Sequence, residues 1–443
     1  MPRRTTRRSF LRQSAAATAA AFAAPAFLRA KSPNEMPNLA GVGVGGKGWG
    51  DINSTSKGAN VIAFCDVETG KGRRSGGYAK AAEQWPRAKR YTDWRKMLDE
   101  LGKELDGVTV STPDHMHAPV TMSALQLGIA TYTQKPLTRT VHEARQLTLA
   151  AEKAGVVTQM GNQGHSSSEY RTLVDLVQSG VIGKIKEAHA WSNRPIWPQG
   201  IDRPAGQDPV PDGLAWDLWL GVAHKRPFKS DVYHPFKWRG WYDFGAGALG
   251  DMGCHIIDPV VWALDLKAPT MVWYEGPEPN PETFPTWELI HYDFPGTKYT
   301  AQEKIHVIWY DGGKLPPKEL ALGAELPSNG TLLVGEKGAV LTPHGKGGPK
   351  LLPEGEFGEF DIVSGADHYQ QWTNAIRGEG QTTSNFGYAG PLTETVLLGT
   401  IASRVANKKL QWDSKNLVFP NSPEATAYVK QDYRDGWEVK GLS

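Results

Sequence analysis

Between residues 39 and 162, short apolar runs alternate with longer stretches in which apolar residues recur at helical spacing. The apolar runs have the length of strands and are nearly continuous, which is typical of parallel strands covered on both faces. They are "LAGVGV" (39–44), "NVIAFCD" (60–66), "DGVTVST" (106–112), "IATYTQ" (129–134) and "VVTQMGN" (156–162). The helical stretches include residues 48–56, 117–128 and 140–155. This order predicts an α/β domain with a doubly covered parallel sheet over residues 36–161.

The pattern changes after residue 165. A predicted helix at 168–179 leads to the strand-like "KIKEAHAWS" (184–192), and little periodicity follows as far as residue 245. A helix is predicted near 251–265, and two more near 366–377 and 391–406. Between them lie the alternating runs "MVWYEG", "WELIHYDF", "KIHVIWY" and "GTLLVGEKGAVLTP", separated by glycine and proline turns. Residues 162–443 are therefore expected to form an α+β domain with an open, mainly antiparallel sheet.

The first 30 residues have the pattern of an export signal. Arg7 and Arg8, followed by Ser-Phe-Leu, precede a short alanine-rich apolar stretch, which resembles a bacterial twin-arginine signal. Cleavage after Ala26 or Ala30 would fit, and an ordinary basic N-terminus is the alternative. No segment approaches the ~20 apolar residues of a membrane span. We expect a periplasmic or otherwise exported protein that meets the twin-arginine translocase in the folded state.

Composition narrows the classes of partner. Hydrophobic residues make up 40% and charged residues 22% of the 443, as in folded soluble domains. Residues 1–30 hold six arginines and no acidic residue, so without them the formal net charge of +2 becomes −4. This balance argues against nucleic acid or an anionic membrane as partner. Cys65 and Cys254 lie far apart in apolar segments and are expected to be buried thiols.

The glycines after the first strand predict a nucleotide loop. Gly41, Gly43 and Gly46 form G-x-G-x-x-G between a strand and a helix, where backbone N–H groups can hold a pyrophosphate. In this pattern Gly41 permits the tight turn, Gly43 the approach of the pyrophosphate, and Gly46 the close packing of the helix. Asp66 ends the next strand and is placed to accept a hydrogen bond from the adenosine ribose, which favours NAD. Arginines at 73 and 74 keep NADP open, since they could bind a 2′-phosphate.

Three further motifs bear on the chemistry. "STPDHMHAP" (111–119) follows a strand at the sheet edge where ligands bind. "TQKPL" (133–137) places Lys135 at the end of the next strand. "GALGDMGCHIIDPVVWAL" (247–264) spaces Asp251, His255 and Asp258 to lie on one face of a helix.

Together these motifs resemble the glucose–fructose oxidoreductase/inositol dehydrogenase (Gfo/Idh/MocA) family over nearly the whole chain after the signal. The resemblance implies a Rossmann domain followed by an open-sheet domain that commonly mediates oligomerisation. The Glu-Lys-Pro of the family appears here as Gln134-Lys135-Pro136, and its Asp-x-x-x-His maps onto Asp251 and His255.

The resemblance and the placement of the motifs also suggest the ligand contacts. Ser111, Pro113, His117 and Lys135 are expected on the cofactor side. "GNQGH" (161–165) resembles a branch of the family with many exported members, which makes His165 a candidate substrate residue.

The residue types agree with hydride transfer from a carbinol carbon, which needs a base and a cation beside the hydroxyl oxygen. His255 is the expected base, Lys135 the cation, and Asp251 orients the substrate or His255. Each of the three residues also has an alternative role that is purely structural. Asp251 could cap the helix, His255 could be a packing residue, and Lys135 could be a solvent-exposed lysine in a turn. His115, His117 and Asp258 fit a site or a scaffold equally. A metal on the Asp251 face is a further alternative, but we expect none.

Six of the 16 tryptophans lie between residues 191 and 241. Indole rings stack on sugars, so Trp238 and the adjacent Arg239 are expected near a carbohydrate, while about half of the cluster builds core. The expected function is NAD(P)-dependent oxidation or reduction of a sugar, polyol or glycoside. Two alternatives remain: a glycosidase or lyase that uses the cofactor transiently, and a binding protein without catalysis.

Overall fold

The computed structural model describes residues 36–70 and 76–443, so the expected signal and the two arginines at 73 and 74 lie outside the described residues. The first domain is built on a six-stranded parallel sheet in the order β3-β2-β1-β4-β5-β6. Its strands are β1 (Asn38–Val42), β2 (Asn60–Cys65), β3 (Lys89–Tyr91), β4 (Gly107–Val110), β5 (Ala130–Thr133) and β6 (Thr158–Met160). The strand order reverses direction at β1, and the crevice between β1 and β4 is where such sheets bind ligands.

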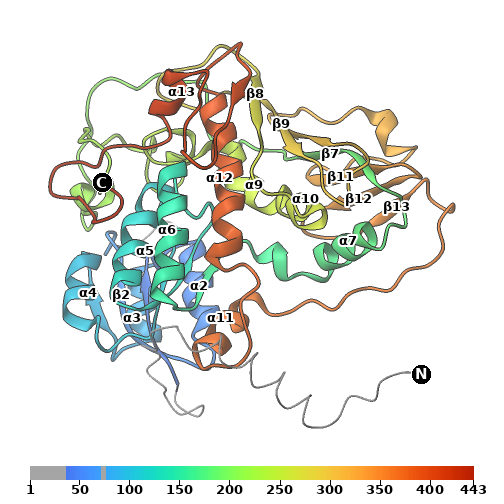
Figure 1. Ribbon diagram of the computed structural model, residues 1–443. Helices are drawn as coiled ribbons and strands as arrows, with labels where there is room; N and C mark the ends of the chain where they lie inside the picture. Colours follow the sequence, from blue (N-terminus) through green and yellow to red (C-terminus); the bar gives the residue numbers. More distant parts are fainter. Residues whose placement is uncertain (1–35, 71–75) are drawn as a thin grey trace, which may run out of the picture.

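Helices alternate with these strands, as the apolar pattern predicts (Figure 1). They are α2 (Lys47–Thr55), α3 (Tyr78–Gln84), α4 (Trp94–Leu101), α5 (His117–Gln126) and α6 (Val141–Ala154). The helix α6 begins at a capping box, in which Thr140 and Glu143 satisfy each other's backbone N–H groups, and it ends at left-handed Gly155.

The second domain contains an eight-stranded sheet in the order β13-β12-β11-β7-β10-β9-β8-β14. Its strands are β7 (Ile185–Trp191), β8 (Met271–Glu275), β9 (Leu289–Pro295), β10 (Lys304–Tyr310), β11 (Gly330–Gly335), β12 (Ala339–Pro343), β13 (Lys350–Leu352) and β14 (Leu410–Gln411). Neighbouring strands are antiparallel except β7 and β10, which run parallel at the centre of the sheet. The expected open, mainly antiparallel sheet is confirmed.

Helices α7 (Ser168–Gln178), α9 (Gly247–Ile256), α10 (Asp258–Leu264) and α12 (Phe386–Ala402) pack on this sheet. The helix expected over 251–265 is two helices, interrupted at Ile257. Pro259 explains the interruption, because it has no N–H to donate to the carbonyl of residue 255. Asp258 therefore begins a new helix and leaves the face that carries Asp251 and His255.

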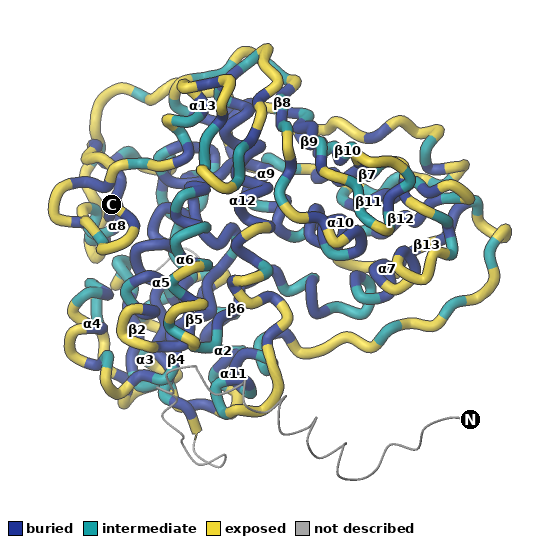
Figure 2. The backbone as a smooth tube through the Cα atoms, viewed as in Figure 1, coloured by how far each residue is buried: buried dark blue, intermediate teal, exposed yellow. Residues whose placement is uncertain are grey.

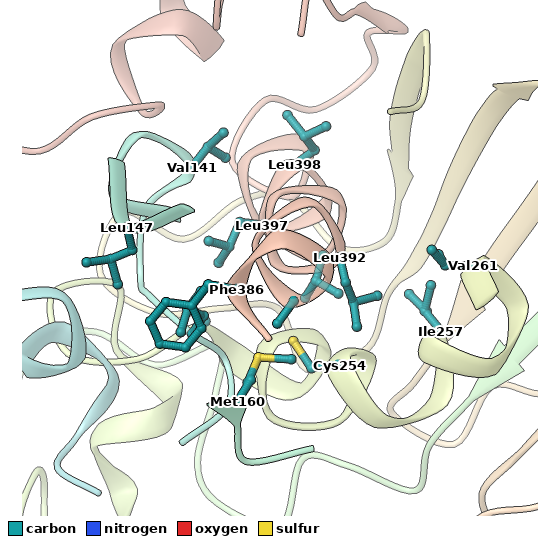
Figure 3. Packing of buried hydrophobic residues seen from close by; sticks show 14 of the residues in the cluster. Val141, Leu147, Met160, Cys254, Ile257, Val261, Phe386, Leu392, Leu397 and Leu398 are labelled. Carbon is teal, nitrogen blue, oxygen red and sulfur yellow. The ribbon is translucent and has the colours of Figure 1, made fainter. Parts of the chain in front are cut away.

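The helix α12 joins the two domains. It contacts α6 on one side and α9, β8 and β9 on the other, and nearly all of its residues are buried. Figure 3 shows Leu392, Leu397 and Leu398 of α12 among side chains from both domains. Cys254 lies in the same core, and it and Cys65 are buried free thiols, as expected.

Residues 192–246 carry little regular structure apart from the short helix α8 (Trp216–Leu220), yet they are well packed. Trp219, Tyr233, Trp241 and Phe244 form a separate apolar cluster there. Figure 2 shows buried backbone passing between exposed stretches in this part of the chain, near α8. Aromatic packing therefore holds this segment where strands and helices do not.

Two short helices complete the chain, α11 (His368–Ile376) and α13 (Pro423–Ala427). The helix α11 returns to the first domain and lies beside α2 (Figure 1). Gln370 and Thr373 of α11 donate hydrogen bonds to the backbone carbonyls of Ser54 and Thr55. The nucleotide-loop helix is thus covered by residues more than 300 positions later in the chain.

Candidate functional site

A cavity of about 450 Å³ opens at the carboxyl edge of β1 and β4 and extends between the two domains. The lining includes the glycine loop, the segments after β2, β4 and β5, the start of α9 and part of the 192–246 segment. Of the expected site residues, those that line it are Gly43, Gly46, Asp66, Ser111, Pro113, His117, Lys135, Trp238, Arg239, Asp251 and His255.

The glycine loop leaves no room for side chains. Gly43 has a φ of +77°, and a Cβ there would lie 2.7 Å from the carbonyl oxygen of Ser111. Gly41 packs against Val44 and Ile52 of the following turn and helix, outside the cavity lining. The close helix packing expected of Gly46 belongs to Gly48, where a Cβ would overlap the Gly43 carbonyl. Gly46 instead has a φ of +56° and precedes the first residue of α2.

Asp66 follows β2 and lies beside this loop. Its carboxylate accepts hydrogen bonds from the backbone N–H groups of Val44 at 2.9 Å and Glu68 at 3.0 Å. Burial raises the pKa of Asp66, and the two backbone N–H groups oppose that rise. The carboxylate is therefore fixed next to the loop, as expected for a group that binds a ribose hydroxyl.

The segment after β4 carries two histidines, of which one packs in the core and the other lines the cavity. His115 is fully buried, and its ring nitrogens face the carbonyls of Phe244 and Trp219, which makes it a packing residue. His117 lines the cavity, while its ring nitrogens lie 2.7 Å and 2.9 Å from the carbonyl oxygens of Pro136 and Thr112. Burial lowers the pKa of His117 to about 4, so its imidazole is neutral.

Asp114 is a cavity residue that the sequence reasoning missed, although it lies inside the quoted 111–119 motif. Its carboxyl is buried and accepts a hydrogen bond from the N–H of Ala246 at 3.1 Å. Burial raises the pKa of Asp114 to about 7, against the opposing effect of Arg239 and Lys135. A buried carboxyl that titrates near neutrality is a common feature of functional sites.

Lys135 and Asp251 form the central ion pair of the site. The Nζ atom of Lys135 lies 2.8 Å from Oδ1 of Asp251 and also donates to the Asp251 backbone carbonyl. Burial raises the pKa of Asp251, but Lys135 and Arg239 outweigh it and hold the pKa well below its usual value. The pair joins the segment after β5 to the first turns of α9, as the two motifs predict.

Gln134 does not face Lys135. Its Nε2 atom donates at 2.8 Å to Oδ2 of Asp51, a fully buried carboxylate on α2. Asp51 also accepts from Lys47, Ser111 and Tyr369. A glutamate at position 134 would place a second carboxylate against Asp51, so the glutamine fits this site because it donates a hydrogen bond.

His255 lies one turn after Asp251 on α9, as expected. Its Nδ1 atom is buried and has no hydrogen-bond partner among the described residues. Burial, together with the Lys135 ammonium and His344, lowers the pKa of His255 well below its usual value. The imidazole is therefore neutral, and burial makes it a weaker base than a solvent-exposed histidine. The ring of His344, which the sequence reasoning did not single out, lies 5.3 Å away from it.

Two arginines surround the same carboxylate. Nε of Arg239 lies 3.3 Å from Oδ1 of Asp251, and Nε of Arg194 lies 3.6 Å from Oδ2. The Arg239 guanidinium stacks on Trp238 at 4.1 Å from the ring centre. Trp238 and Arg239 line the cavity, and their expected contact with a carbohydrate stays a prediction. Arg194 is an addition that periodicity could not reveal.

His165 and Asp258 lie outside the cavity. Nδ1 of His165 is 3.0 Å from both carboxylate oxygens of Asp258, and its ring stacks on Trp262 at 4.0 Å. Asn162 and Tyr388 donate to the same carboxylate. The expectation that His165 faces the substrate is thus wrong. Its ring is hydrogen-bonded to the buried carboxylate of Asp258 on α10 and does not line the cavity.

Five of the six tryptophans are buried, and Trp216 is partly buried. Trp197, Trp219 and Trp238 line the cavity. Trp191 is buried in the second sheet, Trp241 in the aromatic cluster, and Trp216 stacks on Trp219 at 4.7 Å. Trp219 and Trp238 also belong to the aromatic core cluster, so four of the six tryptophans build core, more than the expected half.

The residues present fit a dinucleotide. Gly43 leaves the space that a Cβ would fill, α2 begins at the same loop, and Asp66 is held beside it. In the described part of the chain, no group of three histidine, cysteine, aspartate or glutamate side chains could hold a metal ion. Nor is any helix there long and apolar enough to cross a membrane.

Comparison with known proteins agrees with this geometry. Residues 38–162 match the family model of the Gfo/Idh/MocA oxidoreductases described as an NAD-binding Rossmann fold. Residues 168–302 match the C-terminal alpha/beta domain of the same family, and together the two matches cover more than half of the chain.

Similar proteins include the levoglucosan dehydrogenase of Pseudarthrobacter phenanthrenivorans, 23% identical over 41% of this chain and 38% of its own length. The 2,7-anhydro-N-acetylneuraminate hydratase of Mediterraneibacter gnavus is 24% identical over 35% of this chain and 38% of its own length. These matched regions span well under half of the curated relatives.

Among solved structures, the WlbA dehydrogenase of Bordetella pertussis in complex with NADH and UDP-GlcNAcA has the same fold. It matches with a TM-score of 0.58 at 15% identity, over 86% of this chain and 99% of that one. The fold, the nucleotide loop and the two family models agree: the chain belongs to the Gfo/Idh/MocA oxidoreductase family, and its first domain is an NAD-binding Rossmann domain.

Proposed function

We propose that the protein is an exported oxidoreductase that moves a hydride between NAD and a hydroxyl-bearing carbon of a sugar, polyol or glycoside. The observation that carries this proposal is a single cavity that holds the glycine loop, the Lys135–Asp251 ion pair and His255. An NAD-binding domain alone would fit many substrates, whereas this pair and imidazole supply what a carbinol needs.

The roles follow from the contacts. When bound at the glycine loop, NAD supplies the hydride acceptor or donor. Lys135 has three N–H donors, of which Asp251 takes two, so the third remains for the oxygen of a substrate hydroxyl. His255 is neutral and can receive the hydroxyl proton on oxidation and return it on reduction. Asp251 fixes Lys135, and the tryptophans that line the cavity offer faces for a sugar ring.

Export supports tight binding of the cofactor. Outside the cytoplasm no pool of free NAD is maintained, so a loosely bound nucleotide would be lost. The twin-arginine pattern at Arg7 and Arg8 suits a protein that folds around its nucleotide before it is exported. Retention at nanomolar free nucleotide requires a binding free energy of about −12 kcal/mol.

The test is to purify the mature protein without added nucleotide, release any ligand with acid, and identify it by mass spectrometry. We expect bound NAD(H), and turnover without added nucleotide when a second carbohydrate, or the same sugar after elimination, takes the hydride back from the bound NADH; products are followed by mass spectrometry. A preparation free of nucleotide and active only with millimolar NAD would contradict tight binding. If no carbohydrate were changed, the proposed activity itself would fail.

A second function is favoured by one relative whose name describes hydration, the 2,7-anhydro-N-acetylneuraminate hydratase. Oxidation of a ring hydroxyl acidifies the neighbouring C–H, after which a glycosidic bond can be eliminated and the carbonyl reduced again. Lys135 and His255 would serve these steps too. Release of an aglycone without net reduction of the nucleotide would identify this function, whereas stoichiometric reduction would exclude it.

We also propose that copies of the chain associate through the face of the second sheet opposite the helices. The rings of Trp273, His291 and His306 stack there at 4.8 Å and 5.1 Å; Trp273 and His306 are only partly buried, and His291 is buried between them and the sheet. Partly covered aromatic side chains on a broad sheet are suited to an interface. Light scattering would give the molar mass in solution, and a monomer at all concentrations would contradict the proposal.

A further inference from the structure

A second cavity, of about 330 Å³, lies where the start of α6, the end of α12 and the chain after α13 meet. Its lining includes Arg139, Tyr242, Arg404, Tyr428 and Lys430. It shares no lining residue with the nucleotide cavity. It is therefore separate from the site described above.

The floor of this cavity contains an incompletely bonded arginine. Arg139 keeps only 9% of its surface exposed, and its Nη1 donates at 3.0 Å to the carbonyl of Tyr242. Its Nε and Nη2 atoms are buried without an acceptor among the described residues. Buried donors of a charged group are costly to leave unpaired, so the Arg139 guanidinium favours an acceptor in the adjacent cavity, toward which its donors would have to turn.

A second guanidinium lies at the same cavity. Arg404 lies 3.6 Å from the ring centre of Tyr428 and 4.4 Å from that of Tyr242. Within the described residues, neither Arg139 nor Arg404 forms an ion pair with a carboxylate. The tyrosine rings thus fix the position of Arg404, and Asp243 acts on its charge only from beyond ion-pair distance.

The other charged groups do not cancel this positive charge. Asp243 lines the cavity but forms an ion pair with Arg226. Asp432 and Lys430 are exposed residues of the lining and offset each other. The buried part of the cavity therefore has two guanidinium groups without an anionic partner of their own.

We propose that this cavity binds a small tetrahedral oxyanion of the phosphate class. Guanidinium groups present planar pairs of N–H donors that match the oxygens of such an anion, and two of them suit its double charge. The bound anion would connect the segment after β5, which carries Lys135 four residues before Arg139, to the end of α12 and the C-terminal chain. It would therefore join the two domains.

Inorganic phosphate is the probe. Because the glycine loop also binds phosphate groups, the titration uses protein saturated with NAD, and calorimetry is repeated in chloride at matched ionic strength. Sulfate tests the tetrahedral shape and acetate tests a simple carboxylate. The variants are Arg404→Gln and, at the exposed rim, Lys430→Gln. Arg87→Gln, an exposed arginine of the first domain, makes the same change in charge elsewhere.

We expect saturable binding of one phosphate, weaker by at least about tenfold in Arg404→Gln and unchanged in Arg87→Gln. Phosphate should also raise the Tm of the unsubstituted protein and of Arg87→Gln, but not that of Arg404→Gln. If Arg404→Gln does not fold, Lys430→Gln should show weaker binding.

Three results would overturn the proposal. One is the absence of saturable phosphate binding at about 10 mM, a concentration that detects even weak sites. Another is equal affinity in the cavity variants and Arg87→Gln. The third is a change of oligomeric mass in Arg404→Gln without phosphate binding, which would mean that a second copy of the chain fills the cavity.

Discussion

The ammonium group of Lys135 has one N–H donor left for a ligand, because the side chain and the backbone carbonyl of Asp251 take the other two. The carboxylate that fixes it comes from a position 116 residues later in the chain. The lysine is therefore placed by the contact between domains, and its direction does not depend on residue 134.

Replacement of Lys135 by methionine, or of His255 by asparagine, should reduce the rate of the chemical step by at least about 100-fold, because each removes a positioned acid–base group. Binding of NAD, measured by fluorescence titration, should stay within a few-fold. Lys267→Met, an exposed lysine outside the cavity lining, is the control. Near-normal turnover of Lys135→Met would refute the assigned role.

Asp114 gives a prediction about pH. Its carboxyl ionises near pH 3.8 in the unfolded chain, whereas burial raises its pKa to about 7 in the folded protein. Between these values the folded state holds a proton that the unfolded state has lost, so the free energy of unfolding falls as pH rises.

Asn at this position keeps an acceptor for the Ala246 N–H and cannot ionise. Relative to the unsubstituted protein, Asp114→Asn should therefore gain stability between pH 5 and pH 8, by up to about 3 kcal/mol. Thermal unfolding at the two pH values measures the gain. If the free energies of unfolding of Asp114→Asn and the unsubstituted protein differed equally at pH 5 and at pH 8, Asp114 would not titrate in this range.

The residues of the site were predictable to the extent that they stand in short motifs. Lys135, Asp251 and His255 could be named because strand ends and helix spacing place them. Asp51 and Arg194 could not, since their contacts depend on how distant segments pack. His165 is the opposite case, a residue that a motif placed in the site but that lies outside it. Its ring is held by the buried carboxylate of Asp258, which the motif does not contain.

At the scale of elements, the apolar runs predicted most of the first domain because buried parallel strands are apolar on both faces. The strand β3 was missed, since its sequence "KRY" is short and largely exposed at the sheet edge. The helix over 251–265 was predicted as continuous because its apolar spacing continues through Pro259. The parallel pairing of β7 with β10 depends on topology, which spacing does not encode.

The glycine loop allows a test at this scale. Gly43→Val should abolish NAD binding, because its Cβ would meet the Ser111 carbonyl and fill the space of the pyrophosphate. Gly50→Ala lies on α2 nearby, where a Cβ meets nothing within 4 Å, and should bind NAD normally. Fluorescence titration of both variants, with circular dichroism to confirm folding, measures this. If Gly43→Val and Gly50→Ala bound NAD with equal affinity, the nucleotide would not bind at this loop.

At the scale of the whole molecule, the arrangement of the two domains around one cavity follows from the family resemblance, while the return of α11 to α2 does not. The 192–246 segment has weak periodicity, so its aromatic packing and its share of the cavity became visible only in the structure. Long-range packing of irregular segments has no local sequence signal.

The expected export concerns residues 1–30 together with the rest of the chain, and it gives the last prediction. If residues 1–30 are a twin-arginine signal, changing Arg7 and Arg8 to lysine should leave folded precursor in the cytoplasm. Cell fractionation with immunoblotting measures this, and a single Arg4→Lys change, outside the pair, is the control. Unchanged export of the double variant would rule the signal out.

The position of α11 has a consequence for the order of events on the ribosome. The helix α2, which begins at the nucleotide loop, gains its cover from Tyr369, Gln370 and Thr373 only when the last fifth of the chain is being synthesised. The first domain therefore cannot finish folding while it is the only part outside the ribosome. We infer that NAD is captured after synthesis ends, by a chain whose two domains have already met. Cofactor capture would then report that both domains have been synthesised and have folded together.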